Sequence, residues 1–135
     1  MKTYLVSACL MGLKTRYDGK VMASAACSKA VQGAICIPVC PEQLGGLSTP
    51  RTAANLVGGD GYDVLEEQAR VVTRDGKDVT ENFILGAKKV LEISRKKEIA
   101  KVFLKAKSPS CGIAPLMGVT AALLQAEGYK LVEME

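Results

Sequence analysis

Residues 80–104 read TENFILGAKKVLEISRKKEIAKVFL, an amphipathic stretch that runs directly into a short apolar one. Asp78 and Thr80 stand at its start as candidate helix N-caps. The apolar run at 101–104 has the length of a strand rather than a helix. Residues that would share one face of a helix recur at three- and four-residue spacing: Phe83, Ile84, Ala87, Val90, Leu91 and Ser94. The stretch therefore predicts a helix over 80–97 followed by a strand.

Working outward, three more runs of strand length lie at residues 4–8, 34–39 and 130–132. A second helix is predicted over 119–127, ended by Gly128, and a shorter one around 24–32. Strands that alternate with helices favour a mostly parallel sheet with helices on both faces. We therefore predict an α/β fold of the Rossmann-like or flavodoxin-like kind.

Length and the remaining turn signals complete this outline. At 135 residues and 48% hydrophobic, the chain can bury one sizeable core but not two of ordinary size, so residues 1–135 are expected to form a single domain. Residues 74–77 (Arg-Asp-Gly-Lys) predict a turn that closes a small hairpin begun at 69–72. Residues 58–61 (Gly-Gly-Asp-Gly) lack a GxGxxG frame after a strand, which favours a turn over a phosphate site.

Charge and hydropathy exclude several classes of function. The formal charge of +4 and the pI near 8.8 come from charged residues spread along the chain, and the basic runs at 88–89 and 95–97 fall on the predicted helix as a solvated face. Nucleic acid is therefore not an expected partner. No stretch approaches the roughly 20 apolar residues of a membrane span, and Met1-Lys2 begins no signal-peptide pattern, so we expect a cytoplasmic protein without a membrane partner.

The cysteine and histidine counts narrow the chemistry. Five cysteines are an odd number, and structural disulfides are not expected in a reducing cytoplasm, so the thiols are candidates for metal or redox chemistry. The chain has no histidine. That absence removes Ser-His and Cys-His catalysis and every histidine-ligated zinc or haem site.

Three of the cysteines stand where predicted strands end. Cys9 follows the first strand, Cys40 ends the second and Cys111 lies just past the third. In open α/β sheets the ligand crevice lies at the carboxyl ends of the strands, so these thiols are expected to meet there. Cys27, in the short helix, and Cys36, inside a strand, are interpreted as packing residues.

Three convergent thiols without histidine suit either zinc or an iron-sulfur cluster. A closed structural site takes four ligands, whereas three leave one position open for water or substrate, as in a catalytic site. No CxxC pair supports the set. From spacing alone, three unrelated buried thiols are an equally good interpretation.

The loops around the thiols carry further candidates. Glu42, two residues after Cys40, is a candidate general acid or base, or alternatively half of a salt bridge. Gly45 and Gly46 would allow the backbone to approach a ligand closely.

Two serines and two arginines complete the candidate set. Ser108 and Ser110 are candidates for a hydrogen bond to a developing anion, or for turn formation beside Pro109. Arg16 and Arg51 have the planar fork that grips a polar ligand, and each is equally suited to pairing with an acid.

In several sequence motifs the chain resembles the thiouracil desulfurase family. The matching segments cover nearly the whole chain in order: Val6-Ser7-Ala8-Cys9-Leu10 with Gly12, Arg16-Tyr17-Asp18-Gly19, Pro38-Val39-Cys40-Pro41-Glu42-Gln43-Leu44-Gly45-Gly46-Leu47 with Thr49-Pro50-Arg51, Gly76-Lys77-Asp78-Val79-Thr80, Ser108-Pro109-Ser110-Cys111-Gly112 and Gly118-Val119-Thr120-Ala121-Ala122-Leu123-Leu124. The resemblance implies a 4Fe-4S cluster on Cys9, Cys40 and Cys111, with the fourth iron open to the substrate's sulfur. It implies conversion of 2-thiouracil or 4-thiouracil to uracil and hydrogen sulfide without net redox change.

The resemblance also implies roles for the remaining candidates. Glu42 would activate water and return the proton, while Ser108 or Ser110 would place the substrate or stabilise an intermediate. Arg51 and Arg16 would contact the pyrimidine ring. The partner is then a small thiolated nucleobase.

Two departures and two rival hypotheses accompany this resemblance. Thr15 stands where many relatives have a cysteine, and residues 113–118 form a shorter segment than in many relatives. The principal rival is a module that carries iron-sulfur or sulfur without catalysis, for which Glu42 would be dispensable. A thiol redox protein is a more distant rival, because the chain has no CxxC pair.

Overall fold

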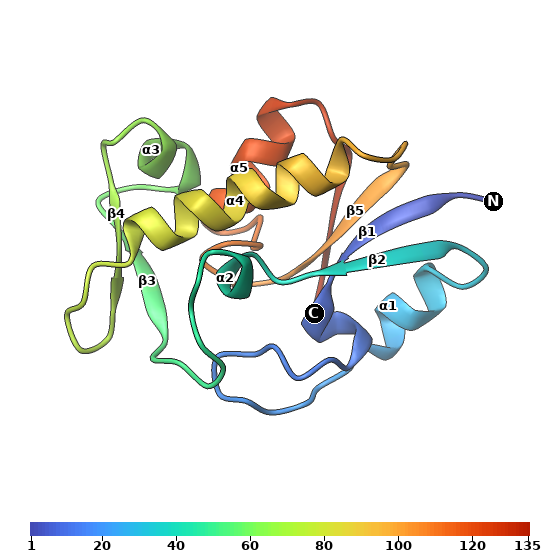
Figure 1. Cartoon of the computed structure of the whole chain (residues 1–135), viewed down its shortest axis with the longest axis horizontal. Coiled ribbons are helices and arrows are strands. Elements are labelled where there is room, and N and C mark those ends of the chain that lie inside the picture. The colour runs from blue at the N-terminus through green and yellow to red at the C-terminus, as the bar shows by residue number, and fades with distance from the viewer.

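The computed structural model describes residues 1–135 and has a four-stranded parallel sheet at its centre (Figure 1). The strand order is β2-β1-β5-β6, with bounds β1 (Thr3–Ser7), β2 (Ile35–Val39), β5 (Lys101–Lys105) and β6 (Leu131–Met134). Each strand lies within two residues of its predicted range. The α/β class with a mostly parallel sheet is therefore confirmed.

The strand order places a topological switch at the middle of the sheet. The chain passes from β1 to β2 on one side and then returns to β5 on the other, so β1 pairs with both neighbours. Val6, for example, lies opposite Pro38 on β2 and Phe103 on β5. Ligands of open α/β sheets bind at the carboxyl ends of the strands beside such a switch.

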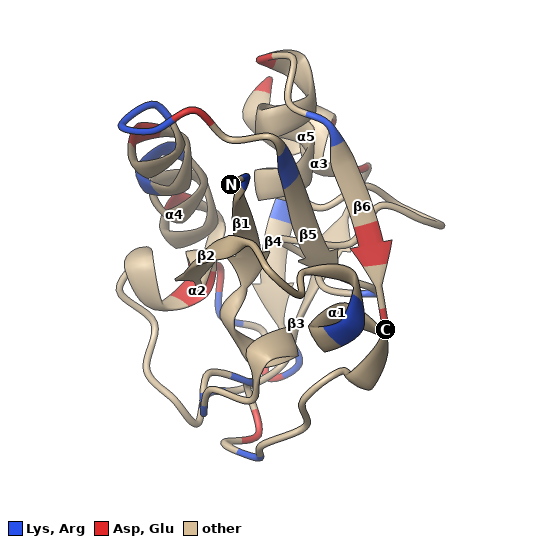
Figure 2. Ribbon diagram, turned by 90° about the vertical axis from the view of Figure 1, so that its right-hand side faces the viewer, with Lys and Arg blue, Asp and Glu red and all other residues tan.

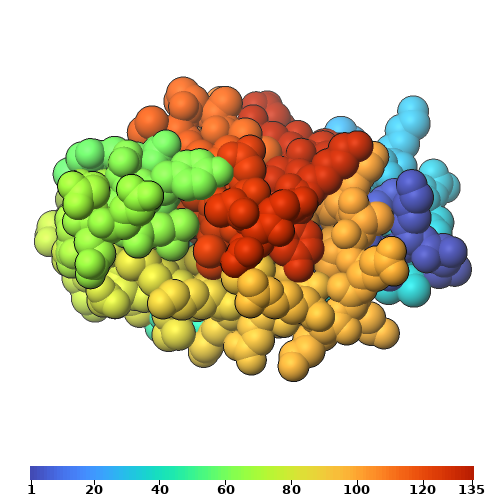
Figure 3. All heavy atoms as spheres, turned by 90° about the horizontal axis from the view of Figure 1, so that it is seen from above, coloured from blue at the N-terminus to red at the C-terminus, as the bar shows by residue number.

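Alternating side chains of the central strands face two different helical layers. Leu5, Val102 and Leu104 pack in one cluster with residues of α4 (Thr80–Ser94) and α5 (Val119–Ala126). Val6 and Phe103 pack on the opposite face, against α1 (Ala25–Ala30) and its flanks. Helices therefore cover both faces of the sheet, as predicted from the pattern. Figure 3 shows α3, α5 and α4 as one continuous layer in green, red and yellow.

A smaller antiparallel unit extends the first layer. β3 (Ala54–Val57) pairs with β4 (Arg70–Thr73), and α3 (Gly61–Leu65) connects them. The predicted small hairpin forms: beyond the turn at 74–77 the chain returns antiparallel to β4 through a bridge from Val72 to Asp78, and the Val79 N–H donates to the Val71 carbonyl at 2.9 Å. The pairing of β4 with β3, a strand that precedes it, was not predicted, because local turn chemistry does not reveal it.

The glycine-rich segment at 58–61 bends the chain at 58–59 and leads into α3, in keeping with the predicted turn. Gly58 has a φ of +89°, and Asp60 then caps α3 in a reciprocal capping box with Asp63.

The first turn of α4 is capped differently from the prediction, because Val79 occupies the N-cap position without a side-chain hydrogen bond. Asp78 still accepts the backbone N–H of Thr80 at 2.9 Å from one residue further out.

The surface carries both signs of charge. Figure 2 shows Lys and Arg interspersed with Asp and Glu on the helices and loops. None of the helices combines the length and apolar character needed to cross a membrane. The longest, α4, spans 15 residues and is amphipathic, with buried residues such as Phe83 and Val90 on one side.

Candidate functional site

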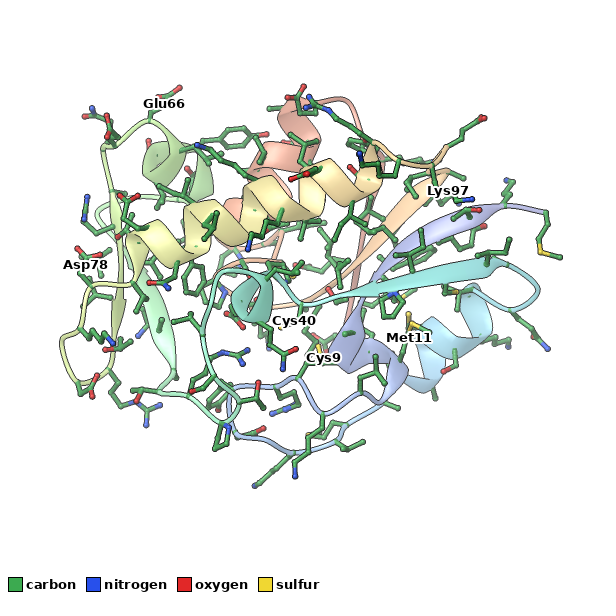
Figure 4. All side chains as sticks on the ribbon, in the orientation of Figure 1. Cys9, Met11, Cys40, Glu66, Asp78 and Lys97 are labelled. Carbon is green, nitrogen blue, oxygen red and sulfur yellow. The ribbon has the colours of Figure 1, made fainter.

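The three predicted thiols lie at the carboxyl edge of the sheet, around the switch point. Cys9 is in the short 3-10 helix η1 (Ala8–Met11) that continues β1. Cys40 follows β2 and is the N-cap residue of α2 (Pro41–Leu44), while Cys111 lies six residues past β5. Figure 4 shows Cys9 and Cys40 near each other below α2.

All three thiols line one cavity of about 700 Å³. Every candidate residue chosen from the sequence lines this same cavity: Cys9, Arg16, Cys40, Glu42, Arg51, Ser108, Ser110 and Cys111. These residues come from the ends of three strands and from the loops that follow them, so the topology alone brings them together.

The thiols are free, and their surroundings keep them protonated while no metal is bound. Cys111 is only 4% exposed, and burial raises its pKa to about 12. Burial also raises the pKa of Cys9 and of Cys40, and charge repulsion from Cys40 adds to the shift at Cys9. The Glu42 carboxylate raises the pKa of all three thiols further.

Cys111 is held by a compact turn of serines. The Oγ of Ser108 accepts the backbone N–H of Ser110 at 3.2 Å and that of Cys111 at 3.1 Å. The hydroxyl of Ser110 donates to the Cys111 sulfur at 3.7 Å, and the Ser108 and Ser110 oxygens lie 3.1 Å apart. Ser108 therefore forms the turn that was its alternative interpretation, whereas Ser110 contacts a thiol directly.

Glu42 forms a largely buried ion pair with Arg51. The Glu42 side chain is 15% exposed and the Arg51 side chain 8%. Arg51 also donates to the carbonyl oxygen of Thr15 at 3.0 Å and to Thr49 Oγ1 at 3.0 Å. Both residues thus take the ion-pairing alternative that the sequence had left open, while still lining the cavity.

Arg16 pairs with a neighbouring acid. Its Nε and Nη2 donate to the two carboxylate oxygens of Asp18 at 3.1 and 3.0 Å, and this pair lowers the pKa of Asp18 to about 2. Arg16 is 21% exposed and keeps Nη1 without a protein partner. Of the two arginines, Arg16 has more donors left for a ligand.

Gly45, three residues after Glu42, serves helix packing rather than a ligand. A Cβ at Gly45 would overlap the carbonyl oxygen of Asn82 on α4, and one at Gly86 would overlap that of Pro41 on α2. Asn82 Nδ2 also donates to the Gly45 carbonyl at 2.8 Å. The expectation of close ligand approach at Gly45 is wrong for this reason. The tight α2–α4 contact instead fixes the helix that carries Glu42.

Two further cavity residues that affect the thiols, Ser7 and Lys105, were not singled out from the sequence. Ser7 is 2% exposed; its oxygen accepts the Lys105 backbone N–H at 3.0 Å, and its hydroxyl lowers the pKa of Cys111. Lys105 ends β5, lines the cavity and lowers the pKa of Cys9 through its charge, yet its ammonium has no hydrogen-bond or ion-pair partner in the protein. The sequence could have indicated both residues, because Ser7 ends β1 just before Cys9 and Lys105 ends β5.

Cys27 and Cys36 lie away from this cavity. Cys27 is 1% exposed in α1 and belongs to the cluster on the far face of the sheet, against which Cys36 on β2 packs. Neither lines the cavity. Their placement matches the packing role predicted for them.

The donor set suits a cluster better than a single ion. No three or more Cys, Asp or Glu side chains stand close enough together to hold one metal ion. A four-iron cluster makes a different demand, because each thiolate binds its own iron and the ligands stand further apart. Three free thiols around one cavity, with no histidine, are the soft donor set that such a cluster takes.

The fold and cavity together define an α/β protein whose ligand site, at the switch point, is lined by thiols. A family model described as 2-thiouracil desulfurase matches residues 4–135. The chain belongs to this family. The family assignment suggested by the sequence motifs is therefore confirmed.

Two relatives illustrate the likeness. An uncharacterized protein of Bacillus subtilis (strain 168), YbbK, is 42% identical in an alignment of 140 positions that covers 95% of this chain and 93% of that protein. A solved structure described as the 4Fe-4S-dependent thiouracil desulfidase TudS is 33% identical, with a TM-score of 0.77 over 98% of this chain and 91% of that one.

Proposed function

We propose that this protein is an iron-sulfur-dependent desulfurase that converts 2-thiouracil or 4-thiouracil to uracil and hydrogen sulfide without net redox change. The observation that carries the proposal is the cavity shared by Cys9, Cys40, Cys111 and Glu42. Membership of the 2-thiouracil desulfurase family and the likeness to a 4Fe-4S-dependent thiouracil desulfidase support it.

Cys9, Cys40 and Cys111 would hold a 4Fe-4S cluster. When bound, this group supplies an iron with an open position that takes up the substrate's sulfur and withdraws electron density from the neighbouring carbon. The buried setting of Cys111 excludes water from one side of the site. The hydroxyls of Ser7 and Ser110 stabilise the anionic sulfur of Cys111, as the lowering effect of each on its pKa indicates.

Glu42 is the group that handles protons. Its carboxylate is held at the cavity wall by Arg51, and it would accept the proton from attacking water. Ser110, next to Cys111, is placed to orient the substrate or the developing anion. The free ammonium of Lys105 adds positive charge to the cavity beside Cys9.

The two arginines have different shares in substrate binding. Arg16 keeps donors free and is our choice for a contact to the pyrimidine ring. Arg51 has most of its donors occupied inside the protein, so any contact it makes is limited.

The test is anaerobic reconstitution with iron and sulfide, followed by iron analysis and an assay for sulfide released from each thiouracil. Four irons per chain with sulfide release support the proposal. Glu42→Gln should keep the iron and reduce turnover by about 100-fold or more. Glu127→Gln is the matched control, because Glu127 pairs with Arg95 at 3.0 Å outside the cavity and should turn over normally.

The same assay separates this proposal from a carrier of iron-sulfur or sulfur. A carrier would load four irons, release no sulfide from either base, and be indifferent to Glu42→Gln. Failure to bind iron would exclude both functions.

A further inference from the structure

Arg51 is held inside the cavity wall by four of its N–H groups. Nη1 donates to the carbonyl oxygen of Ser48 at 3.3 Å and to Thr49 Oγ1 at 3.0 Å. Nη2 donates to the carbonyl oxygen of Thr15 at 3.0 Å and to the Glu42 carboxylate. A guanidinium has five N–H donors, so Nε alone is left without a partner. Such a side chain cannot grip a ligand with its two-pronged fork, but it fixes the groups that it already touches.

The ion pair divides the two oxygens of Glu42 between different tasks. Oε2 accepts from Arg51, and no protein group donates to Oε1. The one buried side-chain N or O atom without a partner is Thr120 Oγ1, so Glu42 Oε1 is not sealed inside the protein. Because Glu42 lines the cavity, its free oxygen is open to that space. Arg51 therefore fixes one oxygen and leaves the other available.

Stability alone does not account for this pair. Both side chains are largely buried, at 15% and 8% exposed, and removing two charges from water costs much of what their attraction returns. The pair also links three separate walls of the cavity: the helix of Glu42, the loop of Thr15 and the loop of Ser48. An arrangement of this kind sets the position of a carboxylate rather than adding stability.

We propose that Arg51 is a positioning residue for Glu42, which fixes Oε2 so that Oε1 points into the cavity, and that it does not recognise the substrate itself. This inference rests on the proposed function, in which Glu42 handles protons. It replaces the ring contact expected for Arg51 with a role exerted through another side chain. A displacement of about 1 Å of a reacting group is enough to cost on the order of 100-fold in rate.

The kinetic test is a double-mutant cycle with Arg51→Ala and Glu42→Gln in the iron-loaded protein. Arg51→Ala should lower kcat by about 100-fold and change KM by less than about threefold. The double variant should be no slower than Glu42→Gln alone, because both changes remove the same function. Arg51→Lys keeps the charge without the fork and should show the same pattern with a smaller loss. Arg70→Ala, which breaks the exposed pair with Asp78, is the control and should keep wild-type kcat.

A second readout uses amide hydrogen exchange in the metal-free protein. Arg51→Ala should speed exchange in residues 15–18 and 48–49 by roughly tenfold, whereas Glu42→Gln should not, because Arg51 still holds both loops. Unchanged exchange in Arg51→Ala would show that the loops are held by other contacts and would overturn the inference.

The kinetic outcomes separate this inference from the proposed function. A rise in KM at constant kcat in Arg51→Ala would mean a direct ligand contact, and additive losses in the cycle would mean a role independent of Glu42. Either result, with a wild type that turns over, overturns the inference on Arg51 alone. A wild type that loads iron but releases no sulfide removes the proposed function and, with it, this role of Arg51.

Discussion

The carbonyl oxygen of Thr15 accepts the S–H of Cys40 at 3.8 Å and, on the same atom, an N–H of Arg51 at 3.0 Å. The first bond exists only while Cys40 carries its proton, whereas the second does not depend on the state of the thiol. The loop of Thr15 therefore stays attached to the cavity wall when Cys40 becomes a thiolate. The backbone makes both contacts, so the side chain at this position is free to vary.

Thr15→Ala tests that conclusion. Because the two contacts come from the carbonyl group, the variant should keep the wild-type iron content after reconstitution and unfold within about 0.5 kcal/mol of wild type. Iron analysis and denaturant unfolding are the measurements. A clear loss of iron would mean that the threonine side chain itself supports the site.

Serine substitutions at the five cysteines should divide them into two groups. Cys9→Ser, Cys40→Ser and Cys111→Ser should each fail to retain four irons, because each removes one of three thiolates around the cavity. Cys36→Ser should load normally. Cys27→Ala should also load normally while costing about 1 kcal/mol of stability, since Cys27 is packed on the far face of the sheet. Iron loss in either of the last two would show that the ligand set is wrong.

Ser108→Ala should weaken the turn that carries Cys111. The variant removes one oxygen that accepts two backbone N–H groups, so we expect a loss of about 1–2 kcal/mol in the unfolding free energy of the metal-free protein. Ser28→Ala is the control, since Ser28 is exposed in α1 and its hydroxyl makes no hydrogen bond. Equal stability of the two variants would contradict a structural role for Ser108.

The sequence predicted the sheet well because its strands are marked by their own residues. The valines and isoleucines of residues 4–8 and 34–39 predict β1 and β2 without reference to distant partners. α2 and α3 were missed because helices of four and five residues are too short to show a repeat. β3 was missed because its partner, β4, lies beyond an intervening helix.

The part of the candidate site that lies at strand ends was predictable from the sequence. Cys9 and Cys40 follow strands directly, so parallel topology alone brings them to one edge. The pairing of Glu42 with Arg51 was not predictable, because the irregular segment between α2 and Arg51 shows no period from which a distance could be inferred. For both residues the sequence therefore allowed either a role in catalysis or ligand binding or a role in an ion pair, and only their contacts in the structure distinguish the two.

Asp78 should make stability depend on pH at the acid end. Its carboxylate accepts N–H groups from Thr80 and Arg70, both at 2.9 Å. The Thr80 side chain, the Thr80 backbone N–H and Arg70, in that order of effect, lower the pKa of Asp78 from 3.8 to about 2. A group with a depressed folded-state pKa stabilises the fold above its unfolded pKa and loses that contribution as pH falls toward the folded value. Asp78→Asn should therefore lower the denaturation midpoint at pH 7 and leave it nearly unchanged near pH 2. A difference that persists undiminished near pH 2 would rule out this linkage.

Glu133 ties down the short segment that follows Cys111. One of its oxygens accepts the backbone N–H of Ile113 at 2.6 Å and that of Ala114 at 3.0 Å, joining β6 to the segment at 113–118. Removal of this acceptor in Glu133→Ala should release the segment, because hydrogen bonds to a charged group contribute about 1.5–3 kcal/mol each where they are shielded from water. Amide exchange of residues 113–114 should rise by at least roughly tenfold.

The same change should reach Cys111, which is two residues away. Glu133→Ala should load iron but lose it faster to a chelator than wild type, whereas Glu133→Gln should lose it more slowly than Glu133→Ala, because its amide oxygen can still accept. Glu135→Ala is the matched control, since Glu135 is exposed and its side chain makes no hydrogen bond or ion pair, and it should release iron at the wild-type rate. If Glu133→Ala exchanged its amides rapidly yet kept its iron as firmly as wild type, the segment would be independent of the Cys111 position. Faster iron loss would instead establish that β6, at the edge of the sheet, helps to hold the thiol at its centre.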